Sequence, residues 1–462
     1  MLPVTKNYEL YPSIVKADEK NEMTVIPTER AFLLFEDKEY FIEIIPRNGN
    51  EPYYYIPEAF EKFPVKAQNG IIRFDYTFDG EQEYLIYLSC DEKVIGEFHV
   101  YSLLPDLYSL KALKGDLHSH SCRSDGARDP SALAGHFREQ GYDFYALTDH
   151  NRYYPGEEAD EVYCGIKCGI TRVVGEEVHA PPSTLHVVHI GGRSSVASLY
   201  IESREQYEKE RADYISRVPE SIPEEYAERY AETQWACDKI HEAGGLAIFP
   251  HPYWIPKGRV YNLNDEFATI MLKSGMFDAF ELMGGATVVG NNRNVALWSE
   301  IRREGFDVSV VGSSDVHGLD NVSSFPHYFT VCFATDNTSD AVTEAVRQGL
   351  SVAVEGVGEE YKRQYRAYGS LRLVSYAQFL LTYYFPERIR MCAGEGIAMR
   401  YYSMGMADAS LVEQSAKLNE EFSDRYFGRL APILPSSEML EFENKWREIQ
   451  RIKGPTTRGG AC

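Results

Sequence analysis

The chain is organised around the stretch Gly115-Asp116-Leu117-His118-Ser119-His120-Ser121-Cys122-Arg123-Ser124-Asp125-Gly126. His118 and His120 are two residues apart, so on a strand both imidazoles would project from the same face. Asp125 follows after a turn, where its short side chain can reach the same point. Two histidines and a carboxylate suit a divalent metal such as Zn, Mn or Fe. The stretch therefore predicts a metal site at the end of a strand.

Candidate ligands recur along the following two hundred residues, each just after an apolar segment that we expect to be a strand. These segments lie at 144–147, 171–174, 186–189, 245–249, 279–283 and 308–311. The segment at 279–283 ends without an obvious ligand, and the candidate ligands at the ends of the others are His150, Glu177, His189, His251, Asp315 and His317. Strands that alternate with helices predict a parallel sheet, and ligands past the strand ends are typical of a (β/α) barrel. Seven strands would make a distorted barrel. A doubly wound sheet is the alternative, but its ligands would gather at one crevice.

Two neighbouring pairs require a choice between candidates. Glu176 and Glu177 are adjacent, so only one can point inward on a strand, and we expect this to be Glu177. His186 and His189 are three residues apart and would lie on opposite faces. We expect His189 to be the ligand, because it lies nearer to the end of the predicted strand.

Residues 1–105 have a different pattern from the rest of the chain. Short segments rich in aromatic and β-branched residues, separated by turn residues, predict an antiparallel sandwich. These segments lie at 31–35, 40–45, 71–76 and 84–88. The region has no cluster of histidine, cysteine and acidic residues, which favours a structural or oligomerising domain over a ligand-binding module.

Three regions are expected in the chain: a β-rich domain at 1–105, a barrel at 115–355 and a helical extension at 356–462. Residues 193–235 are rich in Glu, Arg and Tyr and predict a helical insertion within the barrel. In the extension, helices are expected at 409–422 and 438–452. Their composition suggests a packing arm or a contact in a homo-oligomer.

Composition limits the partners. The formal net charge of −23 over 462 residues argues against a surface that binds nucleic acid or anionic membranes, because phosphates require a basic footprint. No apolar run approaches the ~18 residues of a membrane span, and the first residues lack the apolar core of a signal peptide. The eight cysteines are scattered. We therefore expect a cytoplasmic protein with reduced thiols.

The order of the motifs resembles the PHP (polymerase and histidinol phosphatase) superfamily. His118-x-His120, Ser124-Asp125-Gly126, Thr148-Asp149-His150, a Gly-x-Glu, Pro250-His251-Pro252 and Ser314-Asp315-x-His317 follow one another over residues 115–355. The resemblance implies a distorted (β/α)7 barrel that holds up to three ions, usually Mn, Fe or Zn. It implies nine ligands: His118, His120, Asp125, His150, Glu177, His189, His251, Asp315 and His317.

The implied function is a metal-dependent phosphoesterase that hydrolyses a small phosphomonoester by attack of a metal-bridging hydroxide. Asp315, His317 and His251 would be catalytic, Glu177 would bridge two of three metals, and Asp116 and Asp149 would either orient ligand histidines or be ordinary strand-end acids. Basic residues near the ligands are candidates for binding the substrate phosphate: Arg123, Arg152, Arg193 and Lys257. The alternatives are an amide or cyclic phosphodiester hydrolase, and a non-catalytic ligand-binding protein with a structural metal site.

Overall fold

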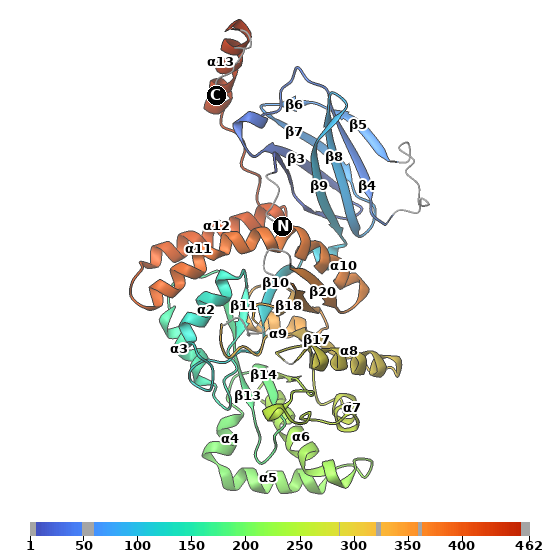
Figure 1. Cartoon of the computed structure of the whole chain (residues 1–462), viewed down its shortest axis with the longest axis vertical. Helices are drawn as coiled ribbons and strands as arrows, with labels where there is room; N and C mark the ends of the chain where they lie inside the picture. The colour runs from blue at the N-terminus through green and yellow to red at the C-terminus, as the bar shows by residue number, and fades with distance from the viewer. Residues whose placement is uncertain (1–5, 49–59, 286, 320–324, 359–362, 454–462) are drawn as a thin grey trace. The chain divides into compact units, whose positions relative to one another are not determined.

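The computed structural model describes residues 6–48, 60–285, 287–319, 325–358 and 363–453 (Figure 1). The chain divides into two compact units, residues 1–108 with 421–462 and residues 109–420. The first is called the β-rich unit and the second the metal-site unit below. Residues 356–420 thus belong to the metal-site unit, and residues 421–462 belong to the β-rich unit. The boundaries predicted for three domains stay a prediction.

The β-rich unit contains two sheets. The first has the order β1 (Tyr8–Tyr11), β3 (Lys20–Pro27), β7 (Ile71–Thr77) and β6 (Ala67–Gln68). The second has the order β2 (Ile14–Lys16), β9 (Lys93–Leu103), β8 (Gln82–Cys90), β4 (Tyr40–Pro46) and β5 (Glu61–Val65). Alternate residues of β4 are buried, and they share one hydrophobic core with Val25 and Ile72 of the other sheet. The β-rich N-terminal region predicted from the sequence is therefore confirmed, and its sheets pack face to face.

The apolar run at 31–35 is not the strand that the sequence predicts. Arg30–Phe32 forms a 3-10 helix, η1, and Leu34 makes only an isolated bridge with Gly70. Leu33 and Leu34 are buried, and the N–H of Phe35 donates to the Tyr40 hydroxyl at 3.0 Å. The run thus fills the core as a loop, in which Phe32 and Leu33 bond the preceding turn and the N–H of Leu34 donates to the distant Gly70 carbonyl.

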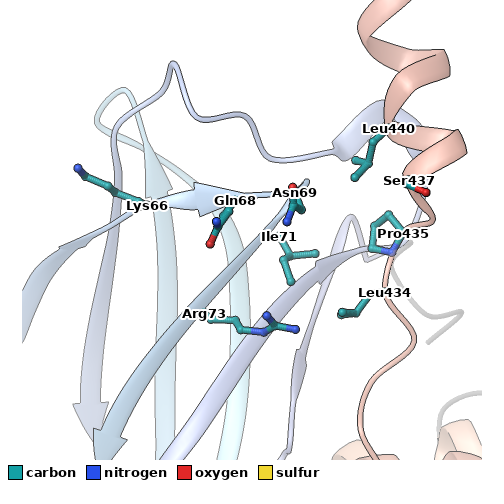
Figure 2. Close-up of a pocket in the computed structure, with 9 residues that line it drawn as sticks. All are labelled: Lys66, Gln68, Asn69, Ile71, Arg73, Leu434, Pro435, Ser437 and Leu440. Atoms are coloured by element: carbon teal, nitrogen blue, oxygen red, sulfur yellow. The ribbon is translucent and has the colours of Figure 1, made fainter.

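A pocket of about 350 Å³ lies in the β-rich unit, between the strands β6 and β7 and the start of helix α13 (Ser437–Lys453). Figure 2 shows the lining residues, which are Lys66, Gln68, Asn69, Ile71, Arg73, Leu434, Pro435, Ser437 and Leu440. Its volume lies in the range of small-molecule sites. The lining contains no histidine, cysteine or acidic residue, so this pocket has no side chains of the metal-ligand type.

The metal-site unit is a mixed α/β structure with two sheets. The six-stranded sheet has the order β12 (Thr171–Val173), β11 (Phe144–Ala146), β10 (Lys111–Asp116), β18 (Tyr328–Ala334), β19 (Ser351–Val357) and β20 (Gln364–Tyr368). The five-stranded sheet has the order β13 (Gly175–Val178), β14 (Val187–Gly191), β15 (Gly245–Phe249), β16 (Ala279–Met283) and β17 (Ser309–Gly312). Hydrogen bonding therefore does not form one continuous ring among the described strands.

The strand directions differ in part from the parallel sheet that the sequence predicts. The neighbours β10, β11 and β12 are parallel, as are β15, β16 and β17, but β14 runs antiparallel to β13 and β15. Only residues 179–186 join β13 to β14. A parallel connection needs about a dozen residues or more, so this short link forces the chain to reverse.

The two sheets share an interior. Buried residues of both sheets form one hydrophobic cluster, including Leu113 and Phe144 from the first and Leu246 and Ile248 from the second. Isolated bridges also connect the loop after β11 to β13, through His150 and Glu177, and the loop after β10 to the loop after β17, through Ser119 and Val316. The segments after β10, β11 and β17 are thereby held near β13 at one end of the interior.

Helices connect most of the strands and extend the unit toward the C-terminus. They are α2 (Pro130–Glu139), α3 (Tyr154–Val162), α4 (Ala197–Glu202), α5 (Arg204–Ser216), α6 (Ala227–Glu242), α7 (Asp265–Lys273), α8 (Val288–Arg303), α9 (Ser339–Arg347), α10 (Leu371–Phe379), α11 (Phe385–Ser403) and α12 (Ala409–Tyr426). Helix α2 has a capped first turn, in which the Asp129 carboxylate accepts from the N–H of Ala132 and Pro130 occupies the first position. In the described part of the chain, no helix has the length and apolarity to span a membrane.

Helix α11 packs closely on α2. A Cβ atom at Gly396 would lie 2.4 Å from the Gly135 carbonyl oxygen, so both helices need glycine where they cross. Beside the crossing, the Arg138 guanidinium of α2 bonds the Glu395 carboxylate of α11 at 2.7 Å, and both side chains are buried. The C-terminal helices predicted from the sequence are confirmed, and α11 belongs to the core of the metal-site unit.

Candidate metal centre

The first motif folds as a loop beyond β10. Both His118 and His120 are buried, with ring centroids 5.1 Å apart, although the strand has already ended at Asp116. A tight turn follows, in which a Cβ atom at Gly126 would lie 2.3 Å from the His120 carbonyl oxygen. Only glycine fits there, and the turn brings an Asp125 oxygen to 3.9 Å from His120 Nδ1.

The carboxylate of Glu177 lies at the centre of the site. It is fully buried, and nitrogens of six histidines lie within 3.6 Å of its oxygens. The six are His118, His120, His150, His179, His186 and His251. Burial opposes the charge of Glu177, but the surrounding histidines outweigh burial and hold its pKa well below the usual range. The group is therefore ionised, as a metal ligand must be.

A second carboxylate, Asp315, faces the first two histidines. Its Oδ1 lies 2.9 Å from His120 Nε2 and 3.3 Å from His118 Nε2. Burial acts against ionisation, yet the two histidines lower the pKa of Asp315 below its ordinary value. Asp315 and His251 both have left-handed backbone conformations, with φ of 51° and 23°. Such strain in non-glycine residues is concentrated at functional sites.

The side chains form four groups in which the ligand atoms lie within 4.8 Å of one another. These groups are His118/His120/Asp315, His118/Glu177/His251, His120/Asp125/His150/His317 and His150/Glu177/His179/His186. The first two are largely buried, whereas Asp125 and His317 are about half exposed. The cluster thus has a buried base and a side that faces solvent.

The donor atoms fit divalent cations. Four buried atoms of the cluster have no hydrogen-bond partner: His118 Nε2, His120 Nδ1, Glu177 Oε2 and His251 Nδ1. Leaving a buried polar atom without a partner costs free energy, and such groups in native proteins need an explanation. Imidazole nitrogens and carboxylate oxygens that converge in this way are the ligand set of Zn, Mn and Fe.

The structure brings together eight of the nine residues implied as ligands, and the exception is His189. Its Nδ1 lies 3.4 Å from Glu176, on the face of β14 opposite to the cluster, whereas His186 Nδ1 lies 2.7 Å from Glu177. The reason is the direction of β14. Because this strand runs antiparallel, its beginning and not its end reaches the metal centre.

Two residues of the site were missed by the sequence analysis. His179 is two residues from Glu177 and therefore on the same face, and its ring stacks on His186 at 3.7 Å. The Glu-x-His spacing was a usable signal, since it repeats that of His118-x-His120. Glu281 lies within β16, and its Oε2 is 2.8 Å from His118 Nδ1. No motif marks Glu281, because it is a single acid within an apolar strand.

Asp116 and Asp149, which lie close in sequence to candidate ligand histidines, accept hydrogen bonds from backbone N–H groups and a hydroxyl, not from imidazole rings. Asp116 accepts from the N–H groups of His118 and Ser314 at 3.1 and 3.0 Å. Asp149 accepts from the N–H and hydroxyl of Ser121 at 2.9 and 2.8 Å. These bonds fix the loops that carry the candidate ligands. The His118 ring is oriented by Glu281, which contacts its Nδ1.

The four predicted phosphate-binding residues are exposed and differ in their partners. Arg123 forms a two-pronged ion pair with Glu158, at 2.8 Å for each bond. In the described part of the chain, no ion pair involves the side chains of Arg152, Arg193 or Lys257. Arg123 is therefore already neutralised, and the other three stay candidates.

The placement of β14 leads to a prediction about metal binding. We expect His186→Ala to weaken metal binding by at least about tenfold, since even residues that only orient ligands contribute 10–100-fold. His189→Ala should keep the full metal content, with some loss of stability. The measurement is metal content of both purified variants after dialysis against limiting metal. An equal loss of metal from both variants, each with the spectrum of a folded protein, would contradict the placement of His186, and not His189, at the metal centre.

The contact between Glu281 and His118 leads to a second prediction. Its carboxylate can accept the Nδ1–H of His118 and so present Nε2 to a metal. We expect Glu281→Gln to lower metal affinity by about 10–100-fold, measured by competition with a chelator. The exposed Glu300→Gln in the same unit is the control. Unchanged affinity in Glu281→Gln would show that the His118 ring is held by packing alone.

Fold and site together define a mixed α/β protein with buried clusters of histidine and carboxylate side chains that could hold metal ions. No protein-family model matches the chain. A 57-residue segment is 42% identical to the DNA polymerase/3'-5' exonuclease PolX of Bacillus subtilis, and it covers 12% of this chain and 10% of PolX. The match thus spans a small part of that relative.

Solved structures with some likeness include three bacterial proteins. A two-domain protein of Bacteroides vulgatus with a predicted PHP-like metal-dependent phosphoesterase has 16% identity, covers 58% of this chain and 78% of its own, and has a TM-score of 0.36. A candidate metal-dependent phosphoesterase of Bifidobacterium adolescentis has 19% identity, coverage of 46% and 89%, and a TM-score of 0.33. An amidohydrolase of Chromobacterium violaceum, with bound sulfate and no metal, has 20% identity, coverage of 46% and 89%, and a TM-score of 0.31.

The chain is similar to PHP-like metal-dependent phosphoesterases, as its motifs indicated. Eight of the ten residues in the metal-ligand groups of the described chain lie on those motifs, and the other two are His179 and His186.

Proposed function

We propose that the chain is a metal-dependent hydrolase of the PHP type that cleaves a small phosphomonoester. The main support is the arrangement around Glu177, where one buried, ionised carboxylate faces six histidines and the cluster opens to solvent at Asp125 and His317. Water adds across the ester P–O bond in this reaction, its oxygen going to phosphorus and a proton to the leaving alcohol. Such a reaction needs positive charge next to the phosphoryl oxygens.

Three divalent ions, of Mn, Fe or Zn, are part of the proposal. They would be held among the overlapping groups His118/His120/Asp315, His118/Glu177/His251 and His120/Asp125/His150/His317, with His118 Nε2 binding one ion only, and His186 lies near enough to Glu177 to join the second group. Bound there, the ions would supply Lewis-acid activation of water and charge stabilisation of the phosphate. Asp315 and His251, on strained backbone, and His317, at the exposed side, are the residues proposed to act directly in catalysis.

A structural metal site fits the geometry less well. Structural sites are closed by protein ligands, whereas catalytic sites keep a position for water or substrate. Here Asp125 and His317 contribute to one group from the exposed side. An amide or cyclic phosphodiester substrate would use the same ions and remains the alternative within hydrolases.

The proposal also includes the type of barrel, the class of substrate, the oligomeric state and the location of the protein. The shared interior of the two sheets supports a distorted (β/α)7 barrel, in which β14 runs antiparallel to both of its neighbours, β13 and β15. The net charge of −23 supports a small phosphorylated substrate and not nucleic acid or a membrane. We further propose that the chain forms a homo-oligomer through its C-terminal helices and is located in the cytoplasm.

The test is hydrolysis by the full-length chain reconstituted with Mn, Fe or Zn. Phosphate release is measured on a panel of phosphomonoesters, with cyclic phosphodiesters and amides as the competing substrates. We expect release from phosphomonoesters that stops when a chelator removes the metal. Cleavage of only the cyclic esters or amides would overturn the phosphomonoesterase assignment, and no cleavage by the metal-loaded protein would overturn the hydrolase.

A further inference from the structure

An exposed tryptophan stands beside the metal centre. Trp254 lies in the loop after β15, five residues past its end, and is 40% exposed. Its ring centroid is 5.7 Å from that of His186 and 6.1 Å from that of His251. Single exposed apolar residues are common, but this one adjoins two histidines of the metal centre.

Hydrogen bonds fix the backbone of the loop at Trp254, whose indole is partly exposed. The N–H of Trp254 donates to the His251 carbonyl at 2.9 Å, and its own carbonyl accepts from the N–H of Asn262 at 2.7 Å. The neighbouring Tyr253 is buried, and the Arg293 guanidinium lies 4.7 Å over its ring. Tyr253 therefore anchors the loop in the core, and Trp254 is not needed to fill it.

Rings continue from Trp254 along one wall of the site. His186 is tilted by 41° to the indole, and His179 stacks on His186 with an interplanar angle of 14°. Aromatic faces pair favourably with other planar rings at centroid distances of about 4.5–7 Å. A substrate whose phosphate sits at the metal centre would place its leaving group next to this wall.

We infer that Trp254 is a stacking platform for a planar ring in the leaving group, so that the substrate is a nucleotide or an aryl phosphate. The inference rests on the proposed phosphoesterase function. Stacking on an aromatic side chain is tolerant of ring identity, because every base has a π-face. Aliphatic phosphates would reach the same metal centre but would leave the indole uncovered.

Kinetics of Trp254→Leu test the inference. The probes are adenosine 5′-monophosphate and phenyl phosphate, with glycerol 3-phosphate as the substrate that lacks a ring. We expect KM for the first two to rise roughly 5- to 150-fold, the range found when stacking side chains are removed, with kcat and the glycerol 3-phosphate KM nearly unchanged. Trp254→Phe should recover most of the loss, and Trp446→Leu, in the β-rich unit, is the matched control. An equal rise for glycerol 3-phosphate would overturn the inference.

Fluorescence of the full-length chain separates this inference from the proposed function. Adenosine 5′-monophosphate should quench tryptophan emission in the wild type and in Trp446→Phe, but not in Trp254→Phe. Hydrolysis of this nucleotide without quenching, and with an unchanged KM in Trp254→Leu, would overturn the platform and leave the phosphoesterase intact. Quenching that depends on Trp254 without phosphate release from any ester would support the ring site and overturn the hydrolysis.

Discussion

Replacing Glu177 by glutamine is expected to lower metal content and hydrolysis together. The change keeps the shape of the side chain but removes the charge that faces six histidine nitrogens within 3.6 Å. Lewis-acid stabilisation by a metal contributes several kcal/mol to a transition state, and about 1.4 kcal/mol corresponds to a factor of ten in rate. We therefore expect kcat/KM to fall by roughly 10³-fold or more, together with the loss of at least one bound ion.

The preceding residue provides a matched control. Glu176 is equally buried, but it accepts from the Ser195 hydroxyl at 2.8 Å and from the N–H of Val196 at the start of α4. Glu176→Gln should therefore lower stability and leave the metal content and turnover of the folded protein unchanged. Metal analysis and phosphate release on both variants make the comparison, with circular dichroism to confirm folding. Full metal content and normal turnover in Glu177→Gln would remove this residue from the centre of the site.

Spacing along the chain was a good guide to those ligands that lie past strand ends. The pairs His118/His120 and Asp315/His317 are each two residues apart, and the structure brings both pairs to the same cluster. The choice of Glu177 over Glu176 also agrees with the structure, because alternate residues of a strand face opposite sides. These inferences needed only local periodicity, which does not depend on how strands pair.

The prediction for His189 depended on strand direction, and the structure places this residue beside Glu176 and outside the metal-ligand groups. A histidine near the end of β14 would reach the site only in a parallel strand, whereas the eight-residue link at 179–186 makes the strand antiparallel. Loop length was therefore the overlooked signal. Glu281 could not be found in this way, because its role depends on contact with His118, a residue 163 positions earlier.

Long-range pairing also explains why the packing of the C-terminal helices was not predicted. Arg138 and Glu395 are 257 positions apart, and each taken alone has the pattern of an ordinary surface charge on a helix. The glycines at the crossing of α2 and α11 similarly have a meaning only when the two helices meet. The sequence predicts helices in the extension, but not the surface against which they pack.

This buried pair leads to a large expected change in stability. In Glu395→Ala the Arg138 guanidinium would lose its 2.7 Å partner, and the N–H of Gly169 and the amide of Asn419 would each lose an acceptor at 2.6 Å. Removing one member of a buried ion pair costs about 3–5 kcal/mol, and Arg138 would keep only the more distant carboxylate of Asp143, at 3.4 Å. We expect a loss of this size in the free energy of unfolding, measured by urea denaturation followed by circular dichroism.

A second ion pair between the same helices shows whether burial is the cause. Arg400 of α11 bonds Glu139 of α2 at 2.8 Å, but both side chains are partly exposed. Glu139→Ala should therefore cost less than about 1 kcal/mol, as is usual for pairs in contact with water. Replacing both members of the buried pair, in Arg138→Met with Glu395→Met, should recover much of the lost stability, since Asp143, the other carboxylate beside Arg138, keeps its ion pair with Arg388. If Glu395→Ala unfolds no more readily than Glu139→Ala, the buried pair does not hold α11 on the metal-site unit, and the glycine crossing must supply that stability.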